Sequence, residues 1–441
     1  MGANDGLAGS PARGAIDVRA LLRLDEGLVH SDVYASQEIF AMEMEKIFHR
    51  GWVYLGHDSE IPEPGDYVLR WAGAQSVIMA RDDQGRIRVF MNRCRHRANS
   101  VAQYEQGNSS FFRCAYHGWT YKNSGELVGV PYREGAYGPD FRNEDFGLVE
   151  PRMDVYRGFI WTNLVDNGLS LAEHLGPAAM KSIDIFCDAS PEGEVILRQG
   201  SIKGLIHANW KFQGGDGYHP PFAHQATFMY MRGKRAGERR NPMAGGGTVE
   251  TGYKQRDLGR GHYCLDLKWA GTGSRLPDTD WAREYRATME KTYGKERAEF
   301  LIRTGGNPHT VFMPNMHMVN YDVRVLRPIA VDKFEIIFYS AFLKGVPHEL
   351  NLKRMRDTED RMGPAGSVNP DDVDMFERNQ LGMQQTVDPW KYMARGMGRE
   401  QPDDDAKTPP EYRVAGTMTG HYADELTQRA QLRWWAEHLS R

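Results

Sequence analysis

The stretches MNRCRHRANS at residues 91–100 and FFRCAYHGWTY at residues 111–121 decide how this 441-residue chain is interpreted. They place Cys94 and His96 in one short arm and Cys114 and His117 in another, as a C-x-H-x17-C-x2-H array. Two soft thiolates mixed with two imidazoles suit a [2Fe-2S] cluster whose irons differ, with both cysteines on one iron and both histidines on the other. The array therefore predicts an electron-carrying centre.

A structural zinc site is the nearest competitor for the same four residues. Zinc sites also use two Cys and two His, but they normally pair the cysteines in a C-x2-4-C turn. Here each arm carries one residue of each type, so two hairpin tips can each give one ligand to each iron. The pattern favours a Rieske centre, and a non-catalytic, zinc-stabilised binding protein is kept as a remote alternative.

Length, charge and cysteine content narrow the possibilities further. A chain of this length is expected to form two domains. Its net charge of -4 and pI near 6.4 argue against a nucleic-acid partner. Its first residues lack the basic start and apolar run expected of a signal peptide, and no apolar stretch reaches the length expected of a membrane span. Outside the array only Cys187 and Cys264 remain, and both are expected to be ordinary buried thiols. With no disulfide framework, the cytoplasm is the expected location.

Local patterns divide the chain into two units. Residues 36–48 have the apolar spacing of a helix, and short β-branched or aromatic runs separated by turn signals follow at 52–56, 66–72, 75–80 and 86–92. We expect a Rieske domain over residues 38–155, and a catalytic domain over 1–37 and 156–441. In the second unit the patterns predict helices at 171–186 and 424–439 and strands at 195–203, 309–314 and 334–343.

A second metal site is indicated by NWKFQGGDGYHPPFAH at residues 209–224. Asp216 and His219 have the i, i+3 spacing of one helical face. The proline pair at 220–221 lets the chain change direction before His224, so that two histidines can converge on one ion. Two histidines with one carboxylate form the facial triad of non-haem Fe(II) oxygenases.

Together these motifs resemble the large (α) subunit of bacterial Rieske non-haem iron aromatic ring-hydroxylating oxygenases. The likeness includes Tyr116, Gly118 and Trp119 beside His117, the D-x2-H-x4-H pattern and the GPAG segment at 363–366. Ala98 departs from the family, which usually has glycine there. The resemblance implies an α+β fold: an antiparallel β Rieske [2Fe-2S] domain and a helix-grip-like catalytic domain with a large antiparallel sheet and covering helices.

The resemblance also implies roles for individual residues. His219 and His224 would bind the mononuclear iron, and Asp216 would bridge an iron histidine to a Rieske histidine of a neighbouring subunit. The carboxylate ligand would come from RMGPAGSVNPDDVDMFE at 361–377, where Asp372 is favoured, Asp371 is second and Asp374 third. The substrate cavity would be lined by Gly217, Pro220 and Phe228. The segment before Asp216 is shorter than in the family, so the hydrogen bond that an asparagine makes near the iron there would be either absent or supplied by Gln213.

The activity implied is that of a terminal oxygenase subunit. It would use O2 and electrons from a ferredoxin or reductase, with NAD(P)H as the ultimate donor, to hydroxylate an aromatic substrate, most simply by cis-dihydroxylation. A Rieske monooxygenase, either an aromatic hydroxylase or a demethylase, is the alternative of the same fold. The family further implies an α3 or α3β3 trimer, with a possible β subunit.

Overall fold

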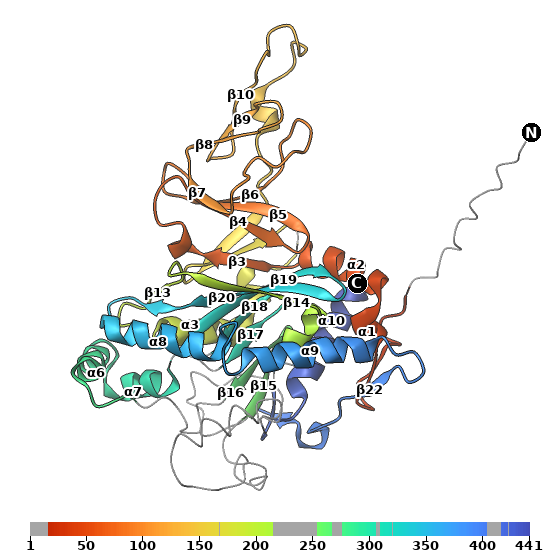
Figure 1. The fold of residues 1–441 in the computed structure, drawn as a ribbon, viewed down its shortest axis with the longest axis vertical. Helices are drawn as coiled ribbons and strands as arrows, with labels where there is room; N and C mark the ends of the chain where they lie inside the picture. Colours follow the sequence, from red (N-terminus) through yellow and green to blue (C-terminus); the bar gives the residue numbers. More distant parts are fainter. Residues whose placement is uncertain are drawn as a thin grey trace, which may run out of the picture.

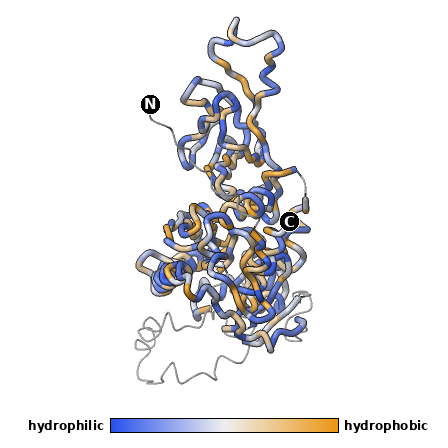
Figure 2. The backbone as a smooth tube through the Cα atoms, turned by 90° about the vertical axis from the view of Figure 1, so that its right-hand side faces the viewer, coloured by the Kyte–Doolittle hydropathy of each residue, from blue (hydrophilic) through white to orange (hydrophobic). Residues whose placement is uncertain are grey.

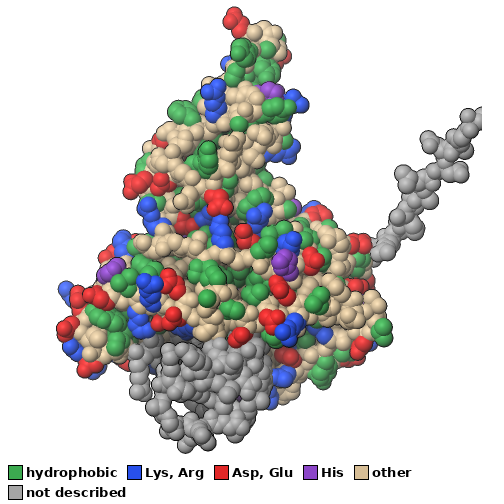
Figure 3. Space-filling view, in the orientation of Figure 1, with side chains coloured by type: hydrophobic (Ala, Val, Ile, Leu, Met, Phe, Trp, Pro, Cys, Tyr) green, Lys and Arg blue, Asp and Glu red, His purple; other side chains and the backbone are tan. Residues whose placement is uncertain are grey.

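The structure is a computed structural model, and it describes residues 16–166, 168–214, 254–266, 276–305, 309–319, 321–403, 416–421 and 423–441. A narrow lobe of small sheets stands on a broad lobe built around one large sheet (Figure 1). The side view shows the same two lobes, with apolar stretches running through the interior of the broad one (Figure 2). On the face drawn in Figure 3, acidic and basic side chains are interspersed. None of the described helices is both long and apolar enough to cross a membrane.

The narrow lobe consists of three antiparallel sheets, ordered β6-β5-β4-β7, β10-β9-β8 and β11-β12-β3. Their strands are β3 (Val53–His57), β4 (Asp66–Ala72), β5 (Gln75–Arg81), β6 (Ile87–Met91), β7 (Gln106–Asn108), β8 (Phe111–Arg113), β9 (Thr120–Lys122), β10 (Leu127–Gly129), β11 (Arg152–Tyr156) and β12 (Phe159–Asn163). The four runs expected between residues 52 and 92 are all strands, because each alternates side chains between two faces and ends at a turn.

The broad lobe contains a nine-stranded antiparallel sheet. In spatial order its strands are β14 (Ser201–Ile206), β20 (Lys333–Ser340), β19 (Asp322–Ala330), β18 (Met316–Val319), β17 (Thr310–Phe312), β16 (His262–Asp266), β15 (Lys254–Gly259), β24 (Thr417–Thr419) and β23 (Gln401–Pro402). Short strands lie outside it: β1 (Leu22–Arg23), β2 (Leu28–His30), β13 (Val195–Ile196), β21 (Phe342–Leu343) and β22 (Trp390–Tyr392).

Helices pack around this sheet: α1 (Asp32–Ala35), α2 (Gln37–Glu43), α3 (Leu171–Cys187), α4 (Trp210–Gly214), α6 (Asp280–Tyr293), α7 (Lys295–Thr304), α8 (His348–Met362), α9 (Asn369–Met383) and α10 (Leu426–Leu439). The predicted α+β class, with small antiparallel sheets in one unit and a large helix-covered antiparallel sheet in the other, is confirmed. The expected helix at 36–48 is α2 followed by a π-helical turn, Met44–Phe48. The strand expected over 195–203 is instead two strands, because Gly200 takes a positive φ of 104° between them.

The structure also bears on where the two units divide. Residue 155 lies inside β11, which pairs with β12, and β12 pairs with β3 of the same sheet. Helix α2 packs instead into the catalytic core, where Glu43 is fully buried and accepts hydrogen bonds from the indoles of Trp210 and Trp435 at 2.8 and 2.6 Å. We therefore propose that the Rieske unit begins after α2 and ends after β12 rather than spanning 38–155.

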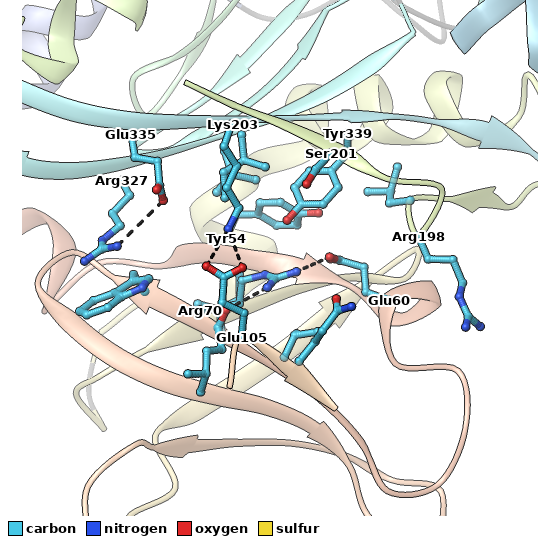
Figure 4. A pocket seen from close by; sticks show the side chains of 18 of the residues that line it. Tyr54, Glu60, Arg70, Glu105, Arg198, Ser201, Lys203, Arg327, Glu335 and Tyr339 are labelled. Atoms are coloured by element: carbon cyan, nitrogen blue, oxygen red, sulfur yellow. Dashed lines mark hydrogen bonds and ion pairs between the residues drawn. The ribbon is translucent and has the colours of Figure 1, made fainter. Parts of the chain in front are cut away.

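A charged cleft of about 620 Å³ lies at the joint between the two lobes (Figure 4). Lys203 of β14 reaches across it to Glu105, with 2.8 Å between nitrogen and carboxylate oxygen. The guanidinium of Arg327, on β19, stacks 3.4 Å above the Trp71 ring of β4. These two contacts join the Rieske lobe to the large sheet, whereas the Arg70–Glu60 and Arg327–Glu335 pairs of the same cleft each lie within one lobe.

Candidate functional site

The four residues of the array lie on two matching turns. Cys94 follows β6, its N–H donates to Asn99 O at 2.8 Å, and its carbonyl accepts from Ala98 N at 3.0 Å. Cys114 follows β8 and makes the same pair of hydrogen bonds: its N–H donates to Trp119 O at 2.8 Å, and its carbonyl accepts from Gly118 N at 2.9 Å. Two equivalent loops thus present one Cys and one His each.

The matching turns explain the unusual residue at position 98. Ala98 has φ of 64° and Gly118, its counterpart, has φ of 72°. An L-residue in this left-handed region costs roughly 1–2 kcal/mol. Alanine therefore keeps the turn that glycine normally supplies, and no predicted ligand is displaced.

The donor atoms fit a cluster in which each iron takes two protein ligands. The imidazole rings of His96 and His117 lie 4.6 Å apart between centroids, and the Nδ1 atoms of both are buried without a hydrogen-bond partner among the described residues. Buried nitrogens of this kind are costly unless something binds them, and Nδ1 coordination would do so. No group of three or more His, Cys, Asp or Glu in the described ranges is arranged to hold a single metal ion, whereas a [2Fe-2S] cluster supplies its own sulfides.

The surroundings favour the protonation states that ligands need. Burial, with smaller contributions from His117 and Arg97, lowers the pKa of His96 and keeps it neutral. Burial opposes ionisation of Cys114, but backbone N–H groups of Tyr116 and His117 and the Asn99 amide outweigh it, so the pKa of that thiol is lowered. Histidine and cysteine bind metals as neutral imidazole and thiolate.

Three aromatic or polar side chains support the array and were not assigned a role from the sequence. Tyr121 OH lies 3.3 Å from Cys94 Sγ, and Asn99 Nδ2 lies 3.7 Å from Cys114 Sγ. Trp119 stacks on His96, with ring centroids 5.1 Å apart and planes 9° from parallel. All three lie within the two stretches quoted above, which is the signal that could have identified them. Their contacts were not predictable, because they depend on how the two turns face each other.

The segment predicted to hold the mononuclear iron is only partly described. Asp216, Gly217, His219, Pro220, His224 and Phe228 lie outside the described residues. The chain leading to them is held at the residue before α4: Asn209 Nδ2 donates to Val331 O at 2.7 Å, and Asn209 N donates to Gln380 Oε1 at 2.9 Å. Gln213, the suggested substitute for the family's asparagine, is buried in α4.

Helix α9 separates the three candidate acids. Its buried residues are Asp372, Phe376 and Gln380, spaced four apart and therefore on one stripe. Phe376 stacks near Phe212 of α4, with ring centroids 6.2 Å apart, and Gln380 binds Asn209. Asp372 thus lies on the stripe that meets α4.

The other two candidate acids, Asp371 and Asp374, do not lie on the buried stripe of α9. Asp374 is exposed and pairs with Arg378 at 2.9 Å, and Asp371 is only partly buried in the same first turn. Of the three candidate acids, Asp372 is therefore the one on the buried stripe that meets α4.

The remaining cysteines match their expected character. Cys187 and Cys264 are buried, and neither forms a disulfide. Burial raises the pKa of Cys187 to about 12, so this thiol stays protonated near neutral pH. Inert buried thiols of this kind serve packing.

The fold and site together define a two-domain protein with a two-cysteine, two-histidine cluster site on a small β lobe and a large helix-covered antiparallel sheet. Comparison with known families gives the Rieske [2Fe-2S] domain over residues 51–141 and the ring-hydroxylating alpha subunit catalytic domain over residues 175–441. The chain belongs to this ring-hydroxylating α-subunit family. It is therefore the catalytic subunit of a Rieske aromatic ring-hydroxylating oxygenase, with a [2Fe-2S] cluster and a mononuclear iron as cofactors.

Individual relatives extend the likeness over most of the chain. The large subunit of anthranilate 1,2-dioxygenase from Acinetobacter baylyi is 31% identical over 404 residues, covering 87% of this chain and 83% of the relative. The N,N-dimethyl phenylurea N-demethylase α subunit from Sphingobium is 40% identical over 206 residues, covering 46% and 44%. The solved structure of naphthalene 1,2-dioxygenase from Rhodococcus bound to indole superimposes with a TM-score of 0.78 at 26% identity, covering 96% of each chain.

Proposed function

We propose that this subunit adds both atoms of dioxygen to an aromatic ring to give a cis-dihydrodiol, using electrons from a ferredoxin or reductase. Support comes from the anthranilate 1,2-dioxygenase relative, which matches across 87% of the chain. When bound, the two iron centres supply single electrons and activate dioxygen. The chain's own residues bind and orient these centres and exclude water.

In this proposal Cys94 and Cys114 bind one iron of the cluster, and His96 and His117 bind the other. His219, His224 and Asp372 hold the mononuclear iron. Asp216 links the two sites of neighbouring protomers by hydrogen bonds between imidazoles, which fix ring orientation. The site residues are proposed from the two quoted motifs and from the buried stripe of α9.

The exposed side of the array supports an assembly of protomers. His96 and His117 are only partly buried, and an open cleft of about 680 Å³ runs past them beside Tyr116, Tyr132 and Tyr137. A neighbouring protomer seated there would bring its Asp216 to the imidazole edges. We propose an α3 or α3β3 trimer, the latter with a β subunit.

A monooxygenase is the second candidate, because the demethylase relative shares 40% identity over 206 residues. Reaction of the reconstituted holoenzyme with ¹⁸O2 and a panel of arenes separates the two. Two labelled atoms in a dihydrodiol support dioxygenation, and one labelled atom, or loss of a methyl group, supports the alternative.

Ligand assignments need a readout that does not depend on turnover. His219→Ala, His224→Ala and Asp372→Asn are each expected to lower mononuclear iron content while leaving acid-labile sulfide and the visible cluster spectrum unchanged. Asp371→Asn and Asp374→Asn are the matched controls. If Asp371→Asn loses iron and Asp372→Asn does not, the carboxylate assignment is wrong.

A further inference from the structure

Two polar side chains interrupt the apolar face of the large sheet. Val311, His317, Arg324 and Phe338 are direct neighbours in one row across β17, β18, β19 and β20. His317 is 2% exposed and Arg324 is 5% exposed. The side chains around them on this face, including Val311, Leu326 and Phe338, belong to one hydrophobic core. Charged residues are rarely buried in this way without a specific partner.

Arg324 uses only part of its hydrogen-bonding capacity. Its Nε donates to Asp322 Oδ2 at 3.3 Å and its Nη2 to the Met362 thioether, a weak acceptor, at 3.2 Å. Among the described residues Nη1 has no acceptor, and neither ring nitrogen of His317 has a partner. The guanidinium lies over the Phe338 ring, 5.1 Å from its centroid. The row therefore presents donors that the described protein leaves largely unused.

The row lies on the side of the sheet that carries α4 and α9, the two described elements next to or containing predicted iron ligands. The same core contains Phe212 of α4 and Phe376 of α9, and α4 packs against β19. Helix α4 leads directly to Asp216, and α9 carries Asp372 in its first turn. Met362, which contacts Arg324, ends α8 just before the segment that leads into α9.

We propose that Arg324 is a specificity-determining residue that binds the carboxylate of an aromatic acid substrate, with His317 beside it. This inference rests on the proposed function. A guanidinium matches a carboxylate in geometry and charge better than any neutral group. Asp322 holds Arg324 through Nε, which leaves Nη1 for the substrate, while Val311 and Phe338 supply apolar surface for a ring.

Charge balance is compatible with a second carboxylate at this guanidinium. Burial raises the pKa of Asp322, although Arg324 opposes the shift. If Asp322 takes up a proton when the substrate binds, the substrate carboxylate is the one anion beside the Arg324 cation. Burial, followed by the charge of Arg324, lowers the pKa of His317 to about 3, so this ring remains a neutral donor and acceptor.

The same strand offers a matched control. Arg327 lies three residues further along β19 on the opposite face, where it contacts Trp71 and Glu335 at the joint of the lobes (Figure 4). Arg324→Met and Arg327→Met remove the same charge from the two faces. Arg324→Lys keeps the positive charge but loses the planar guanidinium. If Arg324→Met alone does not fold, the double variant Asp322→Asn/Arg324→Met removes the charges of both members of the buried ion pair.

The test measures anaerobic binding of benzoate and 2-hydroxybenzoate, and of their neutral counterparts toluene and phenol, to the holoenzyme by calorimetry. The unaltered enzyme is expected to bind the acids more tightly. Arg324→Met should weaken acid binding about 10- to 100-fold, as expected for lost hydrogen bonds to a charged group, with neutral arenes unaffected. Arg327→Met should bind as the unaltered enzyme does, and Arg324→Lys should fall between.

If Arg324→Met and the unaltered enzyme bind the acids with equal affinity, the inference is overturned. Arg324 Nη1 would then be hydrogen-bonded to water and not to a substrate carboxylate. Preference of the unaltered enzyme for toluene would overturn it as well. In both cases the proposed function stands if labelled oxygen still enters a neutral arene. If no arene in the panel is bound or oxidised, the proposed function itself fails.

Discussion

At the scale of single residues, the array depends on donors placed around its sulfur atoms. Burial and the neighbouring Cys94 thiolate raise the pKa of Tyr121, so this phenol stays protonated and donates to Cys94 Sγ across 3.3 Å. A donor to a cluster ligand stabilises the reduced, more negative state and raises the reduction potential.

Tyr121→Phe is therefore expected to lower the potential of the cluster. One hydrogen bond of about 1 kcal/mol corresponds to about 40 mV for a one-electron couple. The potential is measured by redox titration followed by electron paramagnetic resonance. Tyr116→Phe is the control, because Tyr116 is exposed and, within the described part of the chain, its hydroxyl makes no hydrogen bond to a cluster cysteine. Identical potentials for the two variants would show that Tyr121 only fills space.

At the scale of elements, we expect the register between α4 and α9 to set the geometry of the proposed mononuclear site. Gln380 Oε1 accepts from the buried Asn209 N at 2.9 Å, across 171 residues of sequence. Gln380→Met keeps the volume but leaves that N–H unsatisfied, at a cost of about 1–3 kcal/mol. We expect lower stability and a lower mononuclear iron content, with the cluster spectrum retained.

Arg378→Met tests whether this effect is specific to the buried stripe of α9. Arg378 lies two residues before Gln380 on the exposed face, and among the residues that the structure describes its ion pair is with Asp374. An exposed i, i+4 pair contributes about 0.3–0.5 kcal/mol, so iron content should not change. Equal iron loss in both variants would indicate that general weakening of α9, and not its register with α4, is responsible.

Comparing sequence with structure at this scale shows which predictions local patterns can support. The run Asp66–Ala72 and the helix Leu426–Leu439 were predictable because alternation and helical spacing lie within the segment. The ligand turns were predictable because Cys and His spacing is itself local. The Gln380–Asn209 bond, the Tyr121–Cys94 contact and the polar row of His317 and Arg324 were not, because the tertiary fold brings their partners together.

At the scale of the whole molecule, buried histidines make stability depend on pH. Burial is the main cause that lowers the pKa of His262 to about 4, of His317 to about 3, and of His174 well below its ordinary value. Above the unfolded-state pKa of about 6.5 the folded and unfolded forms are both neutral. As the pH falls below that value, only the unfolded form gains protons, so stability is lost.

Between pH 7 and pH 5 each such histidine is expected to remove up to about 2 kcal/mol from the free energy of unfolding. Burial raises the pKa of Asp257 and of Asp322, and these carboxyls therefore act in the opposite direction. The pH dependence of a histidine variant is for this reason best compared with that of a control variant. His174→Gln keeps a donor for Met313 O, which His174 Nε2 contacts at 3.1 Å. Denaturant unfolding at several pH values should show a shallower loss for this variant. His207→Gln, at an exposed histidine, should leave the slope unchanged, and equal slopes for both variants would place the pH dependence elsewhere.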